Sequence, residues 1–300
     1  QYTDETNETI YSYLTTLGNG IENTTENGST TATSTNTKAV TVAGRPLPAT
    51  ISSITISPNE MFLFYLQKET NGTVGYIETI ETGTKNVVWR SALQHLQVYW
   101  PEQDTIYIAT NPSLQGDSIV WSIDTPTEEV TPLITDQVGV QILPTNEMLA
   151  YSYYDTESGV MIAKVLNTTT GDVSQLPLGA DVAKCAWGNT SYIYCAIPPN
   201  IHRETYLEDA QRGVVMPGDI LWRFNVATGA AKQILTPEDE SGFAMSIVDM
   251  EVNDSETFLL FREYSDDSIW RVLLPEDGWL FTEEETVEQA ATSTPPQETE

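Results

Sequence analysis

The residues best suited to recognition chemistry gather in one segment, about 197–218, of an otherwise acidic chain. This segment contains His202, Arg203, Tyr206 and Arg212. Tyr and Arg often dominate the binding energy of interfaces, and a long loop in a compact domain is usually functional or disordered. We predict a lid or recognition loop on one face of the domain, with about two helical turns within 204–212. The alternative is a packed decoration that covers a neighbouring element.

Cys185 and Cys195 are the only cysteines. They flank a turn at 188–190, so a three-residue loop would place them directly opposite one another, within disulfide reach. A bond that closes so short a loop would contribute about 2–3 kcal/mol at most. Two buried free thiols are the alternative. We expect no metal site here, because His95 and His202 are the only histidines and no second cysteine pair exists.

Carboxylates are the most abundant reactive groups, with 43 Asp and Glu residues. In such a chain some carboxylates will lie close together by chance. The clusters at 238–240 and 266–267 would bind Ca²⁺ only weakly and are expected to be solvated loops. The chain has no Gly-x-Ser-x-Gly elbow, P-loop, Gly-x-Gly-x-x-Gly or EF-hand loop. We therefore predict no catalytic residue and no cofactor.

A strand–turn–strand unit must position these residues, and it recurs at 55–65, 98–108, 142–151, 186–195 and 251–261. A period of about 43 residues built from short strands is typical of a β-propeller. The sequence predicts an all-β fold, a propeller or propeller fragment of four-stranded antiparallel blades. About five to six blades are expected.

The first complete unit is predicted to have strands at about 51–56, 61–67, 74–80 and 85–89. Ser57-Pro58-Asn59 supplies the first turn, and Gly83 permits positive φ in the last one. Later blades are expected at about 93–134, 136–178, 181–235 and 243–281. In the last of these, 279–281 is the candidate for a fourth strand.

The ends of the chain are less regular. Residues 1–49 are predicted to form half a blade, with strands at 8–14 and 38–42 and a mobile Asn/Thr/Ser-rich loop at 18–37. The blades would occupy 50–282, and the acidic tail 283–300 would be disordered. Because the chain opens in mid-blade, either its first strands close the ring or upstream blades are missing. We favour a fragment.

The turn at 57–60 followed by an apolar strand resembles the WD40-like repeat of TolB-type propellers, whose usual pattern is Ser-Pro-Asp-Gly. This copy keeps the Ser-Pro, and later copies keep only the Pro or neither. The run 222–225 leading to Thr228-Gly229 resembles the second half of that repeat. The segments 195–198 and 219–222 look like uncharacterised bacterial propellers of this type. The resemblance covers about 50–274 and implies protein binding or a scaffold role outside the cytoplasm, without catalytic residues.

The formal charge is −30, with 13 basic residues. This balance argues against a nucleic-acid partner, because nucleic-acid binding depends on Lys and Arg. The sequence also lacks a run of about 18 apolar residues, the length needed to span a membrane. Seven Asn-x-Ser/Thr triplets are potential glycan acceptors, although chance alone yields several in a chain this rich in Asn, Thr and Ser. Abundant Thr and scarce Lys are typical of an extracytoplasmic location. We expect a secreted, periplasmic or surface-anchored protein whose partner is a protein or a cell-surface component.

The sequence therefore favours a non-catalytic extracytoplasmic binding or scaffold domain. The first alternative is the propeller domain of a larger peptidase-like hydrolase whose catalytic part lies elsewhere. A second alternative is a carbohydrate-active or carbohydrate-binding propeller, which would need aromatic and carboxylate side chains converging on the central channel.

Overall fold

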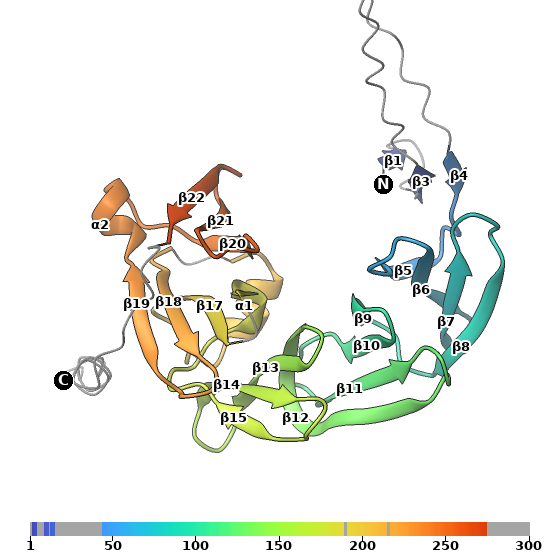
Figure 1. Ribbon diagram of the computed structural model, residues 1–300, viewed down its shortest axis with the longest axis horizontal. Coiled ribbons are helices and arrows are strands. Elements are labelled where there is room, and N and C mark those ends of the chain that lie inside the picture. The colour runs from blue at the N-terminus through green and yellow to red at the C-terminus, as the bar shows by residue number, and fades with distance from the viewer. Residues whose placement is uncertain are drawn as a thin grey trace, which may run out of the picture.

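The computed structural model describes residues 2–4, 9–11, 13–15, 44–188, 191–214 and 217–274. Antiparallel sheets follow one another along an arc, with their first strands on its inner side (Figure 1). Five blades are described, and the first two comprise β5 (Ile51–Ile56), β6 (Phe62–Glu69), β7 (Gly72–Thr79), β8 (Lys85–Ser91), β9 (Leu96–Glu102), β10 (Thr105–Thr110), β11 (Asp117–Asp124) and the first part of β12 (Val130–Pro144). The predicted propeller fold is confirmed.

The remaining three blades follow the same order along the arc. They comprise the second part of β12, β13 (Met148–Asp155), β14 (Val160–Asn167), β15 (Val173–Gln175), β16 (Cys185–Trp187), β17 (Tyr192–Ile197), β18 (Ile220–Asn225), β19 (Ala231–Leu235), β20 (Ile247–Val252), β21 (Phe258–Glu263) and β22 (Ile269–Leu273). Three short helices interrupt them: η1 (Val182–Lys184), α1 (Tyr206–Gln211) and α2 (Pro237–Ser241). None of the described helices has the length and apolar run needed to span a bilayer.

The predicted turn between β5 and β6 is built from its own side chains. Ser57 Oγ accepts a hydrogen bond from the Phe62 N–H at 2.9 Å and donates one to Asn59 Oδ1 at 2.7 Å. Glu60 has a φ of 58°, at the position where the usual repeat carries glycine. The side-chain bonds therefore hold a left-handed residue that the sequence alone would not favour.

Alternation along the strands explains why consecutive residues are buried. On β10, Ile106 and Ile108 pack toward the first blade, whereas Tyr107 and Ala109 pack toward the third. Successive side chains of a strand point to opposite faces of the sheet, and each middle blade has a neighbour on both faces. Strands buried on both faces therefore appear as continuous apolar runs, and the core lies between the blades.

One strand joins two blades without a break. β12 pairs with β11 through its first half and with β13 through its second, so the second and third blades form a single seven-stranded sheet. Asp136 and Gly139 have φ of 57° and 67° where the register shifts. The left-handed residues bend the strand, as at a β-bulge, instead of ending it at the boundary that the sequence predicts near 135.

The N-terminal segment differs in part from its prediction. The strand expected at 8–14 is two strands, β2 (Thr9–Tyr11) and β3 (Tyr13–Thr15), because each bonds to a different partner. β2 pairs with β1 (Tyr2–Asp4), and β3 pairs with β4 (Gly44–Pro46). The strands expected at 38–42 and 279–281, the loop at 18–37 and the tail at 283–300 lie outside the described residues.

Candidate functional site

A cleft of about 600 Å³ lies among the first strands of the blades. Its wall includes Gln97 of β9, Gln141 of β12 and Val248 of β20, which belong to the first strands of three blades. Further parts of the wall come from η1, from the 197–218 insertion with its helix α1, from the start of the β10–β11 connection and from the fifth blade. A volume of this size is within the usual range of small-molecule sites.

The insertion is packed against the ring. Tyr206 and Leu207 of α1 are buried with Ile201 against Tyr154 and Met161 of the third blade. Gln211 at the end of α1 donates to the carbonyl of Pro112 in the second blade. These contacts fix the helix across blades two and three, so its free side faces the cleft.

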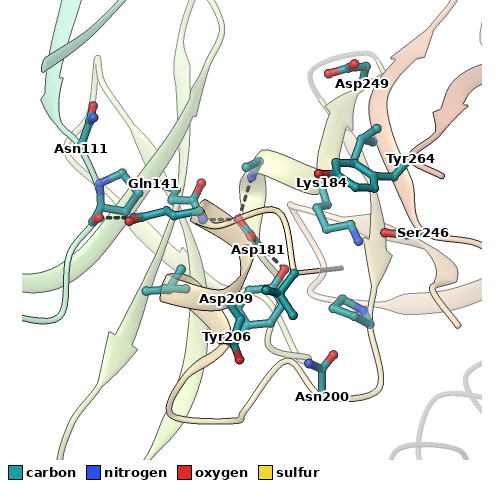
Figure 2. Close-up of a pocket in the computed structure, with 18 of the residues that line it drawn as sticks. Asn111, Gln141, Asp181, Lys184, Asn200, Tyr206, Asp209, Ser246, Asp249 and Tyr264 are labelled. Carbon is teal, nitrogen blue, oxygen red and sulfur yellow. Dashed lines mark hydrogen bonds between the residues drawn. The ribbon is translucent and has the colours of Figure 1, made fainter. Parts of the chain in front are cut away.

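Asp181 joins the insertion to the blades. Its carboxylate accepts from Gln141 Nε2 at 2.6 Å, from the Ala183 N–H at 3.0 Å and from Tyr206 Oη at 2.9 Å (Figure 2). The residue is 3% exposed. Burial raises the pKa of Asp181 above its usual range, although these three hydrogen bonds and the charge of Lys184 oppose the shift.

A second buried carboxylate supports the opposite wall. Asp219 is 1% exposed and accepts from Lys184 Nζ at 2.5 Å and from the Ile247 N–H at 2.6 Å. Burial raises the pKa of Asp219 too, against the opposing charge of Lys184. Within the described part of the chain, Asp219 Oδ1 and Ser246 Oγ are buried without a hydrogen-bond partner.

The rim on this side is shaped by a bulge in β20. Asp249 has a φ of 51° where the β20–β21 register shifts between Val248 and Glu251. Its Oδ2 accepts a hydrogen bond from Arg262 Nε at 2.8 Å and lies 2.6 Å from Nη2, so two guanidinium nitrogens converge on one carboxylate oxygen. The exposed side chains of Tyr264 and Val214 lie at the same cleft, and Tyr264 Oη contacts the Gly213 carbonyl at 3.5 Å.

The predicted recognition residues do not act as one group. Tyr206 lines the cleft and binds Asp181, whereas Arg203 and Arg212 contact Asp209 at 3.7 and 3.9 Å, with 51% and 71% of their side chains exposed. His202 Nδ1 accepts from the Met161 N–H at 3.2 Å, and partial burial of the ring lowers its pKa. The insertion thus packs against the blades through buried residues such as Tyr206, and it also forms one wall of the cleft.

Asp181, Lys184, Asp219 and Ser246 were not predicted. The sequence carries one weak signal for them: Asp is a preferred residue at the start of a helix, and Asp181 caps the short helix η1 by accepting from the Ala183 N–H. An individual Asp gives no signal in a chain with 43 acidic residues. Their convergence depends on how the fourth and fifth blades lie against each other, which no local pattern contains.

Cys185 and Cys195 are paired in register across β16 and β17 and form a disulfide. Both side chains pack with the core between the third and fourth blades. The disulfide therefore links the two inner strands next to η1, which carries Lys184.

The acidic clusters have structural surroundings of their own. Residues 238–240 lie in α2, and Asp267 accepts a hydrogen bond from Arg262 Nη1 at 2.5 Å. Among the residues that the structure describes, no group of three or more His, Cys, Asp or Glu side chains is arranged to hold a metal ion.

No protein-family model matches the chain, and no curated protein matches its sequence. Solved structures do match. The β-propeller domain of the Trilobed protease from Pyrococcus furiosus, described as having an open velcro topology, aligns at a TM-score of 0.53 and 12% identity, over 79% of this chain and 71% of that one. The acylaminoacyl peptidase of Pyrococcus horikoshii aligns at 0.52 and 12%, over 79% of this chain.

This chain spans only 38% of that peptidase. An oligogalacturonate lyase in complex with manganese aligns at a TM-score of 0.53 and 14% identity, over 77% of this chain and 67% of the lyase. At such low identity these likenesses establish the fold alone. The chain is folded as a β-propeller domain.

Proposed function

We propose that this chain is a non-catalytic binding domain that works outside the cytoplasm and receives its partner, a protein or a cell-surface component, in the cleft beside α1. The observation that carries the proposal is the polar wall of that cleft. Ser246 lines it with a buried hydroxyl that has no partner among the described residues, next to the Lys184–Asp219 pair. Leaving a buried polar group unpaired costs about 1–3 kcal/mol, so a site that does this is suited to a group arriving from outside.

The extracytoplasmic part of the proposal is supported by the disulfide. Disulfides persist mainly in oxidising compartments, and Cys185 and Cys195 are joined. The narrower resemblance to TolB-type WD40-like repeats remains a prediction. It is compatible with such a role but adds no residue to the site.

The test is a capture experiment with three baits. One is the full chain, and the second has residues 200–216 replaced by a Gly-Ser linker. The third, a matched control, has the exposed β14–β15 turn at 168–171 replaced in the same way. Circular dichroism and thermal melting verify that each bait is folded.

We expect cross-linking on intact cells, followed by mass spectrometry, to identify a partner retained by the full chain and by the turn control. The linker bait should lose it, because the insertion forms one wall of the cleft. Equal retention by the linker bait would place the partner elsewhere and overturn the proposal.

A second candidate is the propeller domain of a larger peptidase-like protein. It is favoured by one observation: 79% of this chain aligns with a propeller-containing part that makes up 38% of an acylaminoacyl peptidase. To test this candidate, the native gene product is immunoprecipitated with an antibody against this chain and then treated with a fluorophosphonate probe, which labels reactive serines. A labelled serine in a segment beyond residues 1–300 would support this candidate, and an unlabelled product would exclude a serine peptidase.

A further inference from the structure

We propose that the cleft takes an uncharged, polyhydroxylated ligand, a sugar unit of a glycan. This inference rests on the proposed binding function and specifies its ligand class. The sequence left a carbohydrate ligand open on one condition, that aromatic and carboxylate side chains converge on the channel. Tyr206, Tyr264, Asp181 and Asp249 all line the cleft.

The charged side chains on the polar wall and the rim of the cleft already have partners. Lys184 is bound to Asp219, and Arg262 is bound to Asp249 and also to Asp267. Asp181 is occupied by three donors. An ionic ligand at the polar wall would have to displace Lys184 from Asp219 and leave a buried charge unpaired, which is costly. A neutral ligand can bind without disturbing them.

The hydrogen-bonding capacity that remains is mixed. An ammonium group has three donors, and Lys184 Nζ uses one of them on Asp219. Ser246 Oγ, which can donate and accept, has no partner among the described residues and lies in the same wall (Figure 2). A sugar hydroxyl also donates and accepts at one atom. It can therefore accept from Lys184 and exchange a hydrogen bond with Ser246.

The rim adds an apolar face to this polar wall. Tyr264 is 41% exposed and Val214 is 55% exposed, and both line the cleft. A pyranose ring has hydroxyl groups at its edge and C–H groups on its faces. Tyr264 can cover such a face while Lys184 and Ser246 bind the edge, because all three belong to one cavity. The volume of about 600 Å³ is sufficient for a small saccharide.

The experiment begins with the full chain on an array of neutral and acidic oligosaccharides, with a Lys-rich peptide included as a cationic probe. The strongest neutral saccharide is then titrated by calorimetry against Tyr264→Ala and Ser246→Ala. Tyr264→Phe keeps the ring and serves as the conservative control. Phe243→Ala removes another exposed aromatic side chain, one that does not line the cleft.

We expect Tyr264→Ala and Ser246→Ala each to weaken binding by about fivefold, which corresponds to about 1 kcal/mol. Tyr264→Phe and Phe243→Ala should bind as the unmodified chain does. The inference is overturned if no neutral saccharide binds at millimolar concentration, if only acidic glycans or the peptide bind, or if the cleft variants have no effect. If the capture experiment still identifies a partner that depends on the insertion, the proposed binding function remains supported and only the sugar ligand is excluded.

Discussion

Asp181 is the residue on which several parts of the site depend. Its carboxylate holds the inner strand β12, the helix η1 and the insertion together through Gln141, Ala183 and Tyr206. A buried group with several partners is costly to remove, because each partner loses its hydrogen bond at the same time. Asp181 therefore couples the stability of the ring to the position of α1.

The raised pKa of Asp181 predicts how Asp181→Asn will behave with pH. The unfolded chain releases the Asp181 proton at its ordinary pKa of 3.8, and the folded chain holds it to a higher pH. Between these two values the folded state binds more protons, so the unmodified chain loses stability as pH rises, by up to about 1.4 kcal/mol for each pH unit. Asn does not titrate. We expect the free energy of unfolding of Asp181→Asn, relative to the unmodified chain, to improve as pH rises above about 4.

Urea unfolding at fixed ionic strength measures this difference. Asp124→Asn is the control with the opposite sign, because hydrogen bonds from Thr127 lower the pKa of that exposed carboxyl. Its contribution is present above the unfolded value and is lost as pH falls, so replacing it should matter more at higher pH. If Asp181→Asn follows the same direction as Asp124→Asn, the assigned cause of the Asp181 shift is wrong.

Residue by residue, the sequence predicted the partners that are local and missed those that are distant. The opposition of Cys185 and Cys195 follows from a short turn, and a short turn is visible in the sequence. The bond between Gln141 and Asp181 joins residues 40 apart, and that between Asp219 and Ile247 joins residues 28 apart. Such contacts depend on the spatial order of blades, which hydrophobic periodicity does not specify.

At the scale of elements, the docking of α1 depends on a glycine. Gly139 has a φ of 67°, and a Cβ atom at this position would collide with Cδ1 of Leu207. A bulky neighbour and a left-handed backbone thus both require glycine here. The bend in β12 creates the space into which α1 inserts Leu207.

Gly139→Ala should therefore loosen the insertion. The control is Gly171→Ala, because Gly171 has a φ of 78° and no neighbour within 4 Å of an added Cβ. Both variants carry a similar backbone strain of about 1–2 kcal/mol, but only the first displaces Leu207. We expect trypsin to cleave after the exposed Arg203 and Arg212 several times faster in Gly139→Ala than in Gly171→Ala. Equal cleavage rates would mean that Leu207 does not hold the helix.

The strands themselves were largely predictable. The expected strand at 51–56 is Ile51–Ile56, and the expected strand at 85–89 is Lys85–Ser91. Ser57, Asn59 and Gly83 determine these ends through local turn chemistry. The helix expected within 204–212 is Tyr206–Gln211. Its position over the cleft was not predictable, because the helix packs against Gly139 and Tyr154, which are distant in the sequence.

For the molecule as a whole, the charge of −30 has a consequence for stability. Self-repulsion opposes the compact state, and salt weakens it, because the screening length falls from about 30 Å in 0.01 M salt to about 8 Å at physiological ionic strength. We expect the melting temperature to rise with NaCl over this range. Tetramethylammonium chloride is the comparison salt, because its bulky cation screens charge but does not fit a specific sodium site.

Equal rises with the two salts are the expected result. A rise with NaCl alone would indicate a sodium site, and a fall with either salt would mean that ion pairs such as Arg262–Asp249 outweigh the repulsion. Calorimetric scans at constant pH provide the measurement.

The continuous strand β12 also limits how this fold can be rearranged. New segments and relocated chain ends are tolerated at exposed connections, and the first and second blades have one between β8 and β9. The second and third blades have none, since a single strand belongs to both. A circular permutation or an inserted blade at that junction would sever a ladder instead of lengthening a loop. The first blade is therefore separable at an exposed loop, whereas the second and third blades form one unit.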